Sequence, residues 1–368
     1  MTATKLTLRA LNRATLARQM LLAREKTTAA LAVERLVGLQ AQWPRPPFIG
    51  LWSRIEGFAR EDLLGPLRRR ELVRATMMRG TLHVVSARDY VLLRAAIQPV
   101  LSRGMKSILR ERVGAFDVGV LVAAARAYFE EKPRTFTELR DFLMTLHPDG
   151  DERAMGFAVR MNLPLVQVPT EGAAWGFPAT SGFAVAESWL GEPIGDIESP
   201  EALVMRYLAA FGPATVADVQ AWSGLQGLRD VVAALRPRLS VLHDERGREI
   251  FDLPDAPRPA EDTEAPVRFL PEFDNLIVSR ADARFVAAEH RSSIFLSALR
   301  VLPTFLVDGF AAGTWKTERK KAAAALILEP LAALPKKTRA ALEEEGDALV
   351  RFLESDARTF ELRVAKSR

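Results

Sequence analysis

Residues 201–253 read EALVMRYLAAFGPATVADVQAWSGLQGLRDVVAALRPRLSVLHDERGREIFDL, with three helical patterns followed by two short β-like runs. The spacing of apolar residues predicts the helices Glu201–Phe211, Val216–Ser223 and Gly227–Arg238. The hairpin is expected to join Ser240–Leu242 to Glu249–Leu253 through the turn at 245–248. Three helices followed by a hairpin is the order of a winged-helix module.

The same order occurs twice earlier in the chain. The second copy is expected to contain the helices Val118–Glu130, Glu138–Leu146 (capped by Thr137) and Asp151–Met161, with a wing that begins at Leu165–Pro169 and turns at Glu171-Gly172. The first copy is expected to contain the helices Leu8–Leu22, Thr28–Val37 and Glu61–Arg70, the strands Leu72–Met78 and Thr81–Val85, and a further helix from Ala87 to about Arg103. Three diverged copies of one module account for about 250 residues.

Linkers divide the chain into four segments. Their expected bounds are 1–112, 113–195 and 196–256 for three winged-helix modules, and 257–368 for a C-terminal β-rich segment with closing helices. In the fourth segment, Thr304–Val307 and Phe310–Lys316 predict a hairpin, and Leu331–Glu354 predicts one or two helices. The expected fold class is α+β and mainly helical, with three tandem winged-helix (helix-turn-helix) modules followed by a C-terminal β-hairpin and helix segment.

Composition excludes several kinds of chemistry. The 368 residues include no cysteine, which excludes disulfides, thiolate zinc sites, iron–sulfur clusters and cysteine nucleophiles. The four histidines have no metal-ligand spacing, and the chain has no P-loop, dinucleotide fingerprint or Gly-x-Ser-x-Gly elbow. We therefore expect no metal and no cofactor. No signal or membrane-spanning segment is visible, so we expect a cytoplasmic, nucleoid-associated protein.

Positive charge is concentrated at the start of the chain. Residues 1–110 carry 20 Lys and Arg against 7 Asp and Glu, a net charge of +13, whereas the remaining 258 residues carry a net charge of −8. Solvated, arginine-rich helix faces are one explanation. The other, which we favour, is a surface that binds a polyanion.

Two glutamines stand two residues apart directly before a proline cluster, in the run Gly38-Leu39-Gln40-Ala41-Gln42-Trp43-Pro44-Arg45-Pro46-Pro47. Pro44 biases Trp43 away from the helical region, and in an extended segment Gln40 and Gln42 project to the same face. The structural alternative is a polar helix end whose amides cap free carbonyls.

Winged helices commonly read duplex DNA with their third helix in the major groove, so a transcription regulator is one functional hypothesis. Regulators usually carry one such module and dimerise. Three modules in one chain favour wrapping around the duplex instead.

Four runs of residues resemble the AlkZ-type bacterial DNA glycosylases: Val37–Gln42, Met78–His83, Leu270–Leu276 and Asp308–Trp315. They occur in order and span nearly the whole chain. The resemblance implies three tandem winged helices arranged as a C-shaped DNA-binding architecture. It also implies the catalytic pattern Gln-apolar-Gln, which falls on Gln40 and Gln42. It also associates the members that carry this Gln-apolar-Gln pattern with bulky N7-alkylguanine adducts and, in some cases, with interstrand cross-links. Some members of the family are self-resistance factors in producers of alkylating antibiotics.

Two neutral amides suit a substrate that is already activated. An amide is a poor base, but its carbonyl oxygen can hold a water molecule near C1′ and stabilise positive charge on the sugar. An N7-alkylguanine is cationic and leaves as a neutral base. We therefore expect a monofunctional glycosylase with an open site for bulky adducts and little activity on uncharged lesions.

Further residues are candidates for contacts to DNA. Strand alternation would place Arg79, Thr81 and His83 on one face, although a lone strand histidine is as readily structural. Trp43 stacks on a base or fills the core, and core packing is favoured. The remaining candidates are Arg45, Lys316 and Arg319. The expected partner is double-stranded DNA carrying alkylated guanine, bound by a monomer, with a non-enzymatic regulator or an architectural DNA binder as the alternatives.

Overall fold

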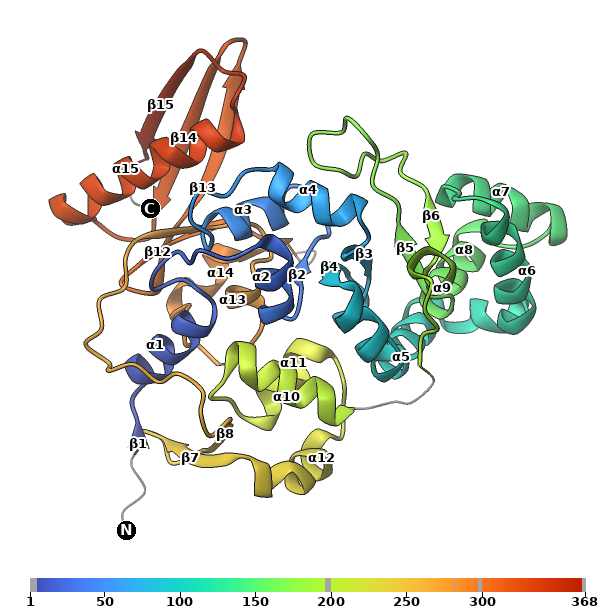
Figure 1. Cartoon of the computed structure of the whole chain (residues 1–368), viewed down its shortest axis with the longest axis horizontal. Coiled ribbons are helices and arrows are strands. Elements are labelled where there is room, and N and C mark those ends of the chain that lie inside the picture. Colours follow the sequence, from blue (N-terminus) through green and yellow to red (C-terminus); the bar gives the residue numbers. More distant parts are fainter. Residues whose placement is uncertain (1–4, 196–199, 281, 297–299, 366–368) are drawn as a thin grey trace.

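The computed structural model describes residues 5–195, 200–280, 282–296 and 300–365 of a mixed α/β chain (Figure 1). The predicted boundary at 195/196 borders residues 196–199, which lie outside the described residues. The first segment contains β1 (Lys5–Leu6), α1 (Leu8–Arg18), α2 (Ala29–Arg35), β2 (Leu39–Gln40), α3 (Pro46–Trp52), α4 (Glu61–Arg68), β3 (Leu72–Thr76), the 3₁₀ turn Met78–Gly80, β4 (Leu82–Ser86) and α5 (Ala87–Leu109). A 3₁₀ turn, Arg110–Ala115, leads into the second segment.

The second and third segments each contain three helices followed by two strands. The elements of the second are α6 (Val118–Glu131), α7 (Phe136–Leu146), α8 (Glu152–Asn162), β5 (Leu165–Gln167), β6 (Phe183–Val185) and α9 (Ala186–Leu190). Those of the third are α10 (Pro200–Phe211), α11 (Val216–Ser223), α12 (Leu228–Leu235), the 3₁₀ turn Arg236–Arg238, β7 (Ser240–Asp244) and β8 (Glu249–Asp252). The predicted helices and strands of both segments are therefore present, with small shifts at their ends.

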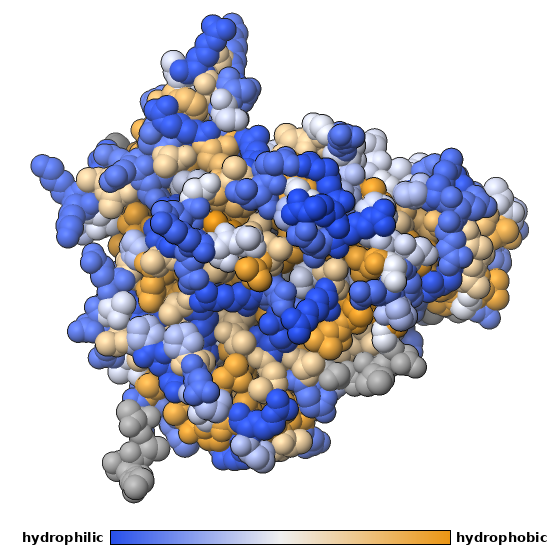
Figure 2. All heavy atoms as spheres, in the orientation of Figure 1, coloured by the Kyte–Doolittle hydropathy of each residue, from blue (hydrophilic) through white to orange (hydrophobic). Residues whose placement is uncertain are grey.

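The fourth segment is built around a sheet. Its elements are β9 (Arg268–Leu270), α13 (Asn275–Val278), the 3₁₀ turn Ala288–His290, α14 (Arg291–Ile294), β10 (Phe295–Leu296), β11 (Arg300–Val301), β12 (Thr304–Val307), β13 (Phe310–Lys320), β14 (Ala323–Pro330), α15 (Lys336–Leu353) and β15 (Thr359–Val364). The predicted hairpin is confirmed as β12–β13, whereas β14 and β15 were not foreseen. With α15 they project from the body (Figure 1), and the tip of this projection is hydrophilic (Figure 2).

Threonine caps begin several helices. Thr28 caps α2, and Thr215 forms a capping box with Asp218 at α11. At α7 the prediction was wrong by two residues, because Thr135, not Thr137, accepts from the backbone N–H of Glu138 and completes a capping box with it.

The expected wings of the first two segments are not separate hairpins. Strands β2, β4, β3, β5 and β6 form one antiparallel sheet in that order, and β3 pairs with β5 through Arg74 opposite Gln167. Likewise β1 pairs with β7, so the start of the chain completes the sheet of the third segment. The edge strand β2 carries Gln40, which lies opposite His83 of β4.

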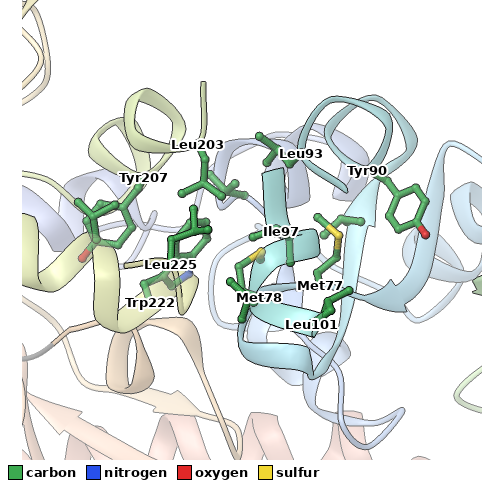
Figure 3. Close-up of a cluster of buried hydrophobic side chains, with 14 of the residues drawn as sticks. Met77, Met78, Tyr90, Leu93, Ile97, Leu101, Leu203, Tyr207, Trp222 and Leu225 are labelled. Atoms are coloured by element: carbon green, nitrogen blue, oxygen red, sulfur yellow. The ribbon is translucent and has the colours of Figure 1, made fainter. Parts of the chain in front are cut away.

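A shared apolar core supports this sheet from behind. Side chains of α5 and of the turn before β4 face those of α10 and α11 (Figure 3), and all of them belong to one buried cluster that extends from Val37 to Phe251. Leu93 and Ile97 meet Leu203 and Leu225 in this region (Figure 3). Packing at the density of a protein interior makes this junction of α5, α10 and α11 rigid.

Much of the positive charge near the start of the chain is paired inside the protein. The partners come mostly from the later, acidic part, in the pairs Arg9–Asp308, Arg13–Asp308, Arg18–Asp252, Arg24–Glu345, Arg45–Glu354 and Arg54–Asp274. Arg13, Arg18 and Arg54 are buried. The expectation that this charge excess marks a polyanion-binding surface is therefore wrong for Arg13, Arg18 and Arg54, which instead join segments of the fold.

Candidate active site

A cavity of about 1310 Å³ lies where the first, second and fourth segments meet. Its described lining residues are Gln40, Gln42, Trp43, Arg79, Gly80, Thr81, Phe157, Arg160, Met161, Glu272, Phe273, Val278, Phe295, Leu296, Arg300, Val301 and Leu302. The walls therefore combine the end of β2, the turn before β4, helix α8, the loop between β9 and α13, and the strands β10 and β11.

Gln40 and Gln42 both face this cavity, as the extended segment predicted. The backbone N–H of Ala41 donates to the carbonyl of Leu82 over 2.7 Å, which continues the strand pairing of β2 beyond Gln40. The side chain of Gln40 is buried, with 7% of the residue exposed, whereas Gln42 is exposed. Gln40 thus places its amide at the buried floor of the cavity, and Gln42 places its amide at the exposed rim.

The amide of Gln40 has a defined orientation. Its Oε1 accepts a hydrogen bond from Nη2 of Arg79 over 2.7 Å. A guanidinium has donors only, so the amide oxygen must point to Arg79. Oε1 of Gln42 accepts from the backbone N–H of Leu82 over 3.4 Å. Each carbonyl oxygen therefore keeps one lone pair for a further donor.

Arg74 fixes the backbone between the two glutamines. Its Nε and Nη2 donate to the carbonyl of Ala41 over 2.9 and 2.7 Å, and Nη2 also reaches the carbonyl of Gln42 over 3.2 Å. Nη1 donates to the Oε1 of Gln167 in the second segment. Burial, assisted by the charge of Arg160, lowers the pKa of Arg74 to about 10. No local pattern around Arg74 indicated this role.

Arginines around the cavity lack carboxylate partners. Within the described residues, no ion pair involves Arg74, Arg79 or Arg160, in contrast to the paired arginines elsewhere. Arg79 sits in a left-handed turn with φ +55°, where its guanidinium also donates to the carbonyl of Trp222. Burial lowers the pKa of Arg79 to about 10, so the group is still charged at neutral pH. The charges of Arg79 and Arg160 at the cavity wall are therefore not neutralised by a paired carboxylate within the described residues.

His83 is fully buried, which contradicts the expected contact with DNA. Its Nδ1 lies 3.0 Å from the carbonyl of Thr81. Burial first, and the charge of Arg79 second, lower the pKa of His83 to about 3, so the ring is neutral. The alternation argument failed because Arg79 belongs to a turn and not to the strand. Thr81 remains at the cavity wall and donates to the carbonyl of Met78.

Trp43 is 59% exposed at the cavity, so the favoured expectation of core packing is wrong. Arg45 lies further from the opening, where it pairs with Glu354 over 3.2 Å. Lys316 and Arg319 lie on β13 and do not line the cavity; they pair with Glu329 and Asp356 over 2.9 and 2.8 Å.

The run Pro271-Glu272-Phe273-Asp274-Asn275 ties the fourth segment to the glutamine strand. Asp274 receives two hydrogen bonds from Arg54 over 2.9 and 2.8 Å, and both side chains are fully buried. The Nδ2 of Asn275 donates to the carbonyl of Gly38. Gly38 has φ +89°, and a Cβ there would lie 2.5 Å from Val85, so the tight entry into β2 requires glycine.

In the part of the chain that the structure describes, no three His, Asp or Glu side chains form a group that could hold a metal ion. None of the helices over these same residues has both the length and the apolarity needed to cross a membrane.

Comparisons with known proteins give one consistent result. The family model for "DNA glycosylase AlkZ-like" matches residues 33–352. An "Interstrand DNA cross-link repair glycosylase" of Streptomyces sahachiroi is 26% identical over 327 residues, which cover 81% of this chain and 85% of that protein. The solved structure of the Streptomyces sahachiroi DNA glycosylase AlkZ aligns with a TM-score of 0.76 at 22% identity, covering 98% of this chain and 100% of that one. At that identity the structural match establishes the fold.

Proposed function

This chain belongs to the DNA glycosylase AlkZ-like family, whose members are hydrolases acting on N-glycosyl bonds, and we propose that it releases cationic N7-alkylguanine from duplex DNA. The proposal includes bulky adducts and interstrand cross-links. The observation that carries it is the pair of neutral amides, Gln40 and Gln42, on the wall of one large open cavity. The Streptomyces relative, named for the repair of interstrand cross-links, supports the choice of substrate.

The size of the cavity favours a bulky lesion. Its volume of about 1310 Å³ exceeds the roughly 300–1,000 Å³ of ordinary small-molecule pockets. A tight pocket for a flipped base would exclude a cross-linked or bulky adduct. An open cavity admits such an adduct together with a part of the opposite strand.

The two amides position water in this mechanism. The C1′–N9 bond breaks, its electron pair moves to N9, and the alkylated guanine leaves as a neutral base. The second lone pairs of the Gln40 and Gln42 oxygens accept hydrogen bonds from the water that adds to C1′. Arg79 holds the Gln40 oxygen in place, so the gain comes from positioning and from dipoles fixed before the reaction.

DNA is held, in this proposal, by residues around the cavity and along the concave face of three winged-helix units in a C-shaped molecule. The repeated order of three helices and two strands supports these units. Arg79, Arg160 and Thr81 lie where phosphates near the lesion would pass, and exposed Trp43 would stack on a base. Arg45, Lys316 and Arg319 would contact flanking duplex. The protein would act as a monomer.

The test uses duplexes that carry a single N7-methylguanine, a bulkier N7 adduct or an uncharged base lesion. After incubation with the protein, alkali converts each abasic site into a strand break. We expect breaks at both cationic lesions and almost none at the uncharged one. Tight binding to one undamaged sequence without any lesion-dependent break would contradict the proposal and support the regulator instead.

A further inference from the structure

One carboxylate lies among the described residues that line the cavity. Glu272 faces the same space as Gln40 and Gln42, and every other charged lining residue that the structure describes is an arginine. A negative charge at this place repels DNA phosphates and so weakens binding to undamaged DNA. We therefore ask which contribution to the reaction would compensate for the weaker DNA binding that Glu272 causes.

The surroundings of Glu272 provide no structural role for it. No hydrogen bond or close ion pair joins its side chain to another residue within the described ranges. Arg45, whose charge acts on Glu272, is paired with Glu354 over 3.2 Å, and Arg300 is exposed. Burial raises the pKa of Glu272, while the charges of Arg45 and Arg300 oppose that rise. The carboxylate is thus half-buried, aimed at the cavity and available to a ligand.

The backbone on both sides holds Glu272 in register with the glutamines. Phe273 has φ +59°, a left-handed conformation that costs about 1–3 kcal/mol for a bulky residue and persists only when its surroundings enforce it. The buried pair of Asp274 with Arg54 and the hydrogen bond from Asn275 to Gly38 enforce it here. The carboxylate and the two amides therefore belong to one rigidly connected unit.

We propose that Glu272 is the anionic group of the active site, which recognises the positive charge of the alkylated guanine and of the sugar cation and accepts the proton of the attacking water. The inference rests on the proposed function. When the water oxygen bonds to C1′, one of its protons must leave. The amides are too weakly basic to take it, whereas a carboxylate holds it and passes it to solvent. Glu272 would thus supply the negative charge that the Gln-Ala-Gln pattern lacks.

The test compares Glu272→Gln, which keeps the shape and removes the charge, with Glu171→Gln, which removes the same charge from an exposed turn. Excision of N7-methylguanine is measured at saturating enzyme, and binding to undamaged duplex is measured in parallel. For Glu272→Gln we expect a fall in excision of about 10²-fold with undamaged DNA bound as tightly as by the wild type or more tightly. Glu171→Gln should match the wild type, and Glu272→Asp, which keeps the charge, should retain more activity than Glu272→Gln.

Two results would overturn the inference alone: excision by Glu272→Gln within two-fold of the wild type, or a loss of DNA binding in proportion to the loss of excision, which indicates a structural role. A wild-type protein that excises no cationic lesion overturns the proposed function itself. The wild-type arm therefore distinguishes the two failures. Thermal unfolding of each variant verifies that it is folded.

Discussion

At the scale of single residues, the hydrogen bond from Arg79 determines the orientation of the Gln40 amide. A carboxylate at this position would form an ion pair with Arg79, whereas the amide accepts one hydrogen bond over 2.7 Å and stays neutral. A neutral oxygen with one free lone pair holds water without deprotonating it. That property suits a leaving group that departs without protonation.

On the neighbouring strand β4, the buried His83 makes the stability of the fold depend on pH. The folded state keeps its pKa near 3, against an ordinary value of 6.5, so the unfolded chain binds more protons below pH 6.5. Lowering the pH from 6.5 to 5 should therefore destabilise the fold, with a contribution from His83 approaching ~1.4 kcal/mol per pH unit. Urea unfolding of the wild type and of His83→Leu at several pH values in this window measures the slope.

The variant His83→Leu should lose that contribution, and His290→Gln, at a half-buried histidine elsewhere, should keep it. Equal slopes for His83→Leu and the wild type would show that His83 is not held neutral in the folded protein.

Part of the site could be predicted from local sequence, and part could not. The shared direction of Gln40 and Gln42 follows from the geometry of an extended chain. The partners that fix them do not, because Arg74 acts on Ala41 from 33 positions away and Asn275 acts on Gly38 from 237 positions away. Such contacts exist only after the segments have packed together.

At the scale of elements, the predictions failed where strands that are distant in sequence pair with each other, because local patterns do not show which strands become neighbours. The order of helices and strands identified β3, β4 and β5 as strands, but it could not show that β3 pairs with β5 and so joins the strands of two segments into one sheet. Helix α3 was not predicted, since no element was assigned to the residues after the proline cluster, although proline is favourable in the first turn of a helix.

The link between α3 and the loop before α13 depends on the buried pair Arg54–Asp274. Arg54→Met leaves the carboxylate of Asp274 buried without its partner, and we expect a loss of about 3–5 kcal/mol in stability. Arg69→Met, which breaks the exposed pair with Glu71, should change stability little, because water and salt screen an exposed ion pair. Urea unfolding of both variants at pH 7 measures the difference; similar midpoints would contradict the role given to the buried pair.

At the scale of the whole molecule, charge is divided between two tasks. Arginines near the start of the chain pair with acids from the third and fourth segments and so join the segments. Arg79, Arg160 and Arg300, for which the described residues provide no ion pair, line the cavity that holds Gln40 and Gln42. The assembled fold therefore places positive charge where DNA would enter and two neutral amides where the bond would break.

The most direct test is single-turnover excision from a duplex with one N7-alkylguanine by the wild type, Gln40→Ala and Gln42→Ala, with the exposed Gln226→Ala as a control. We expect each cavity variant to bind the duplex normally and to lose about 10²–10³-fold in rate, while Gln226→Ala matches the wild type. Excision at the wild-type rate by both cavity variants, folded and bound to DNA, would contradict the account.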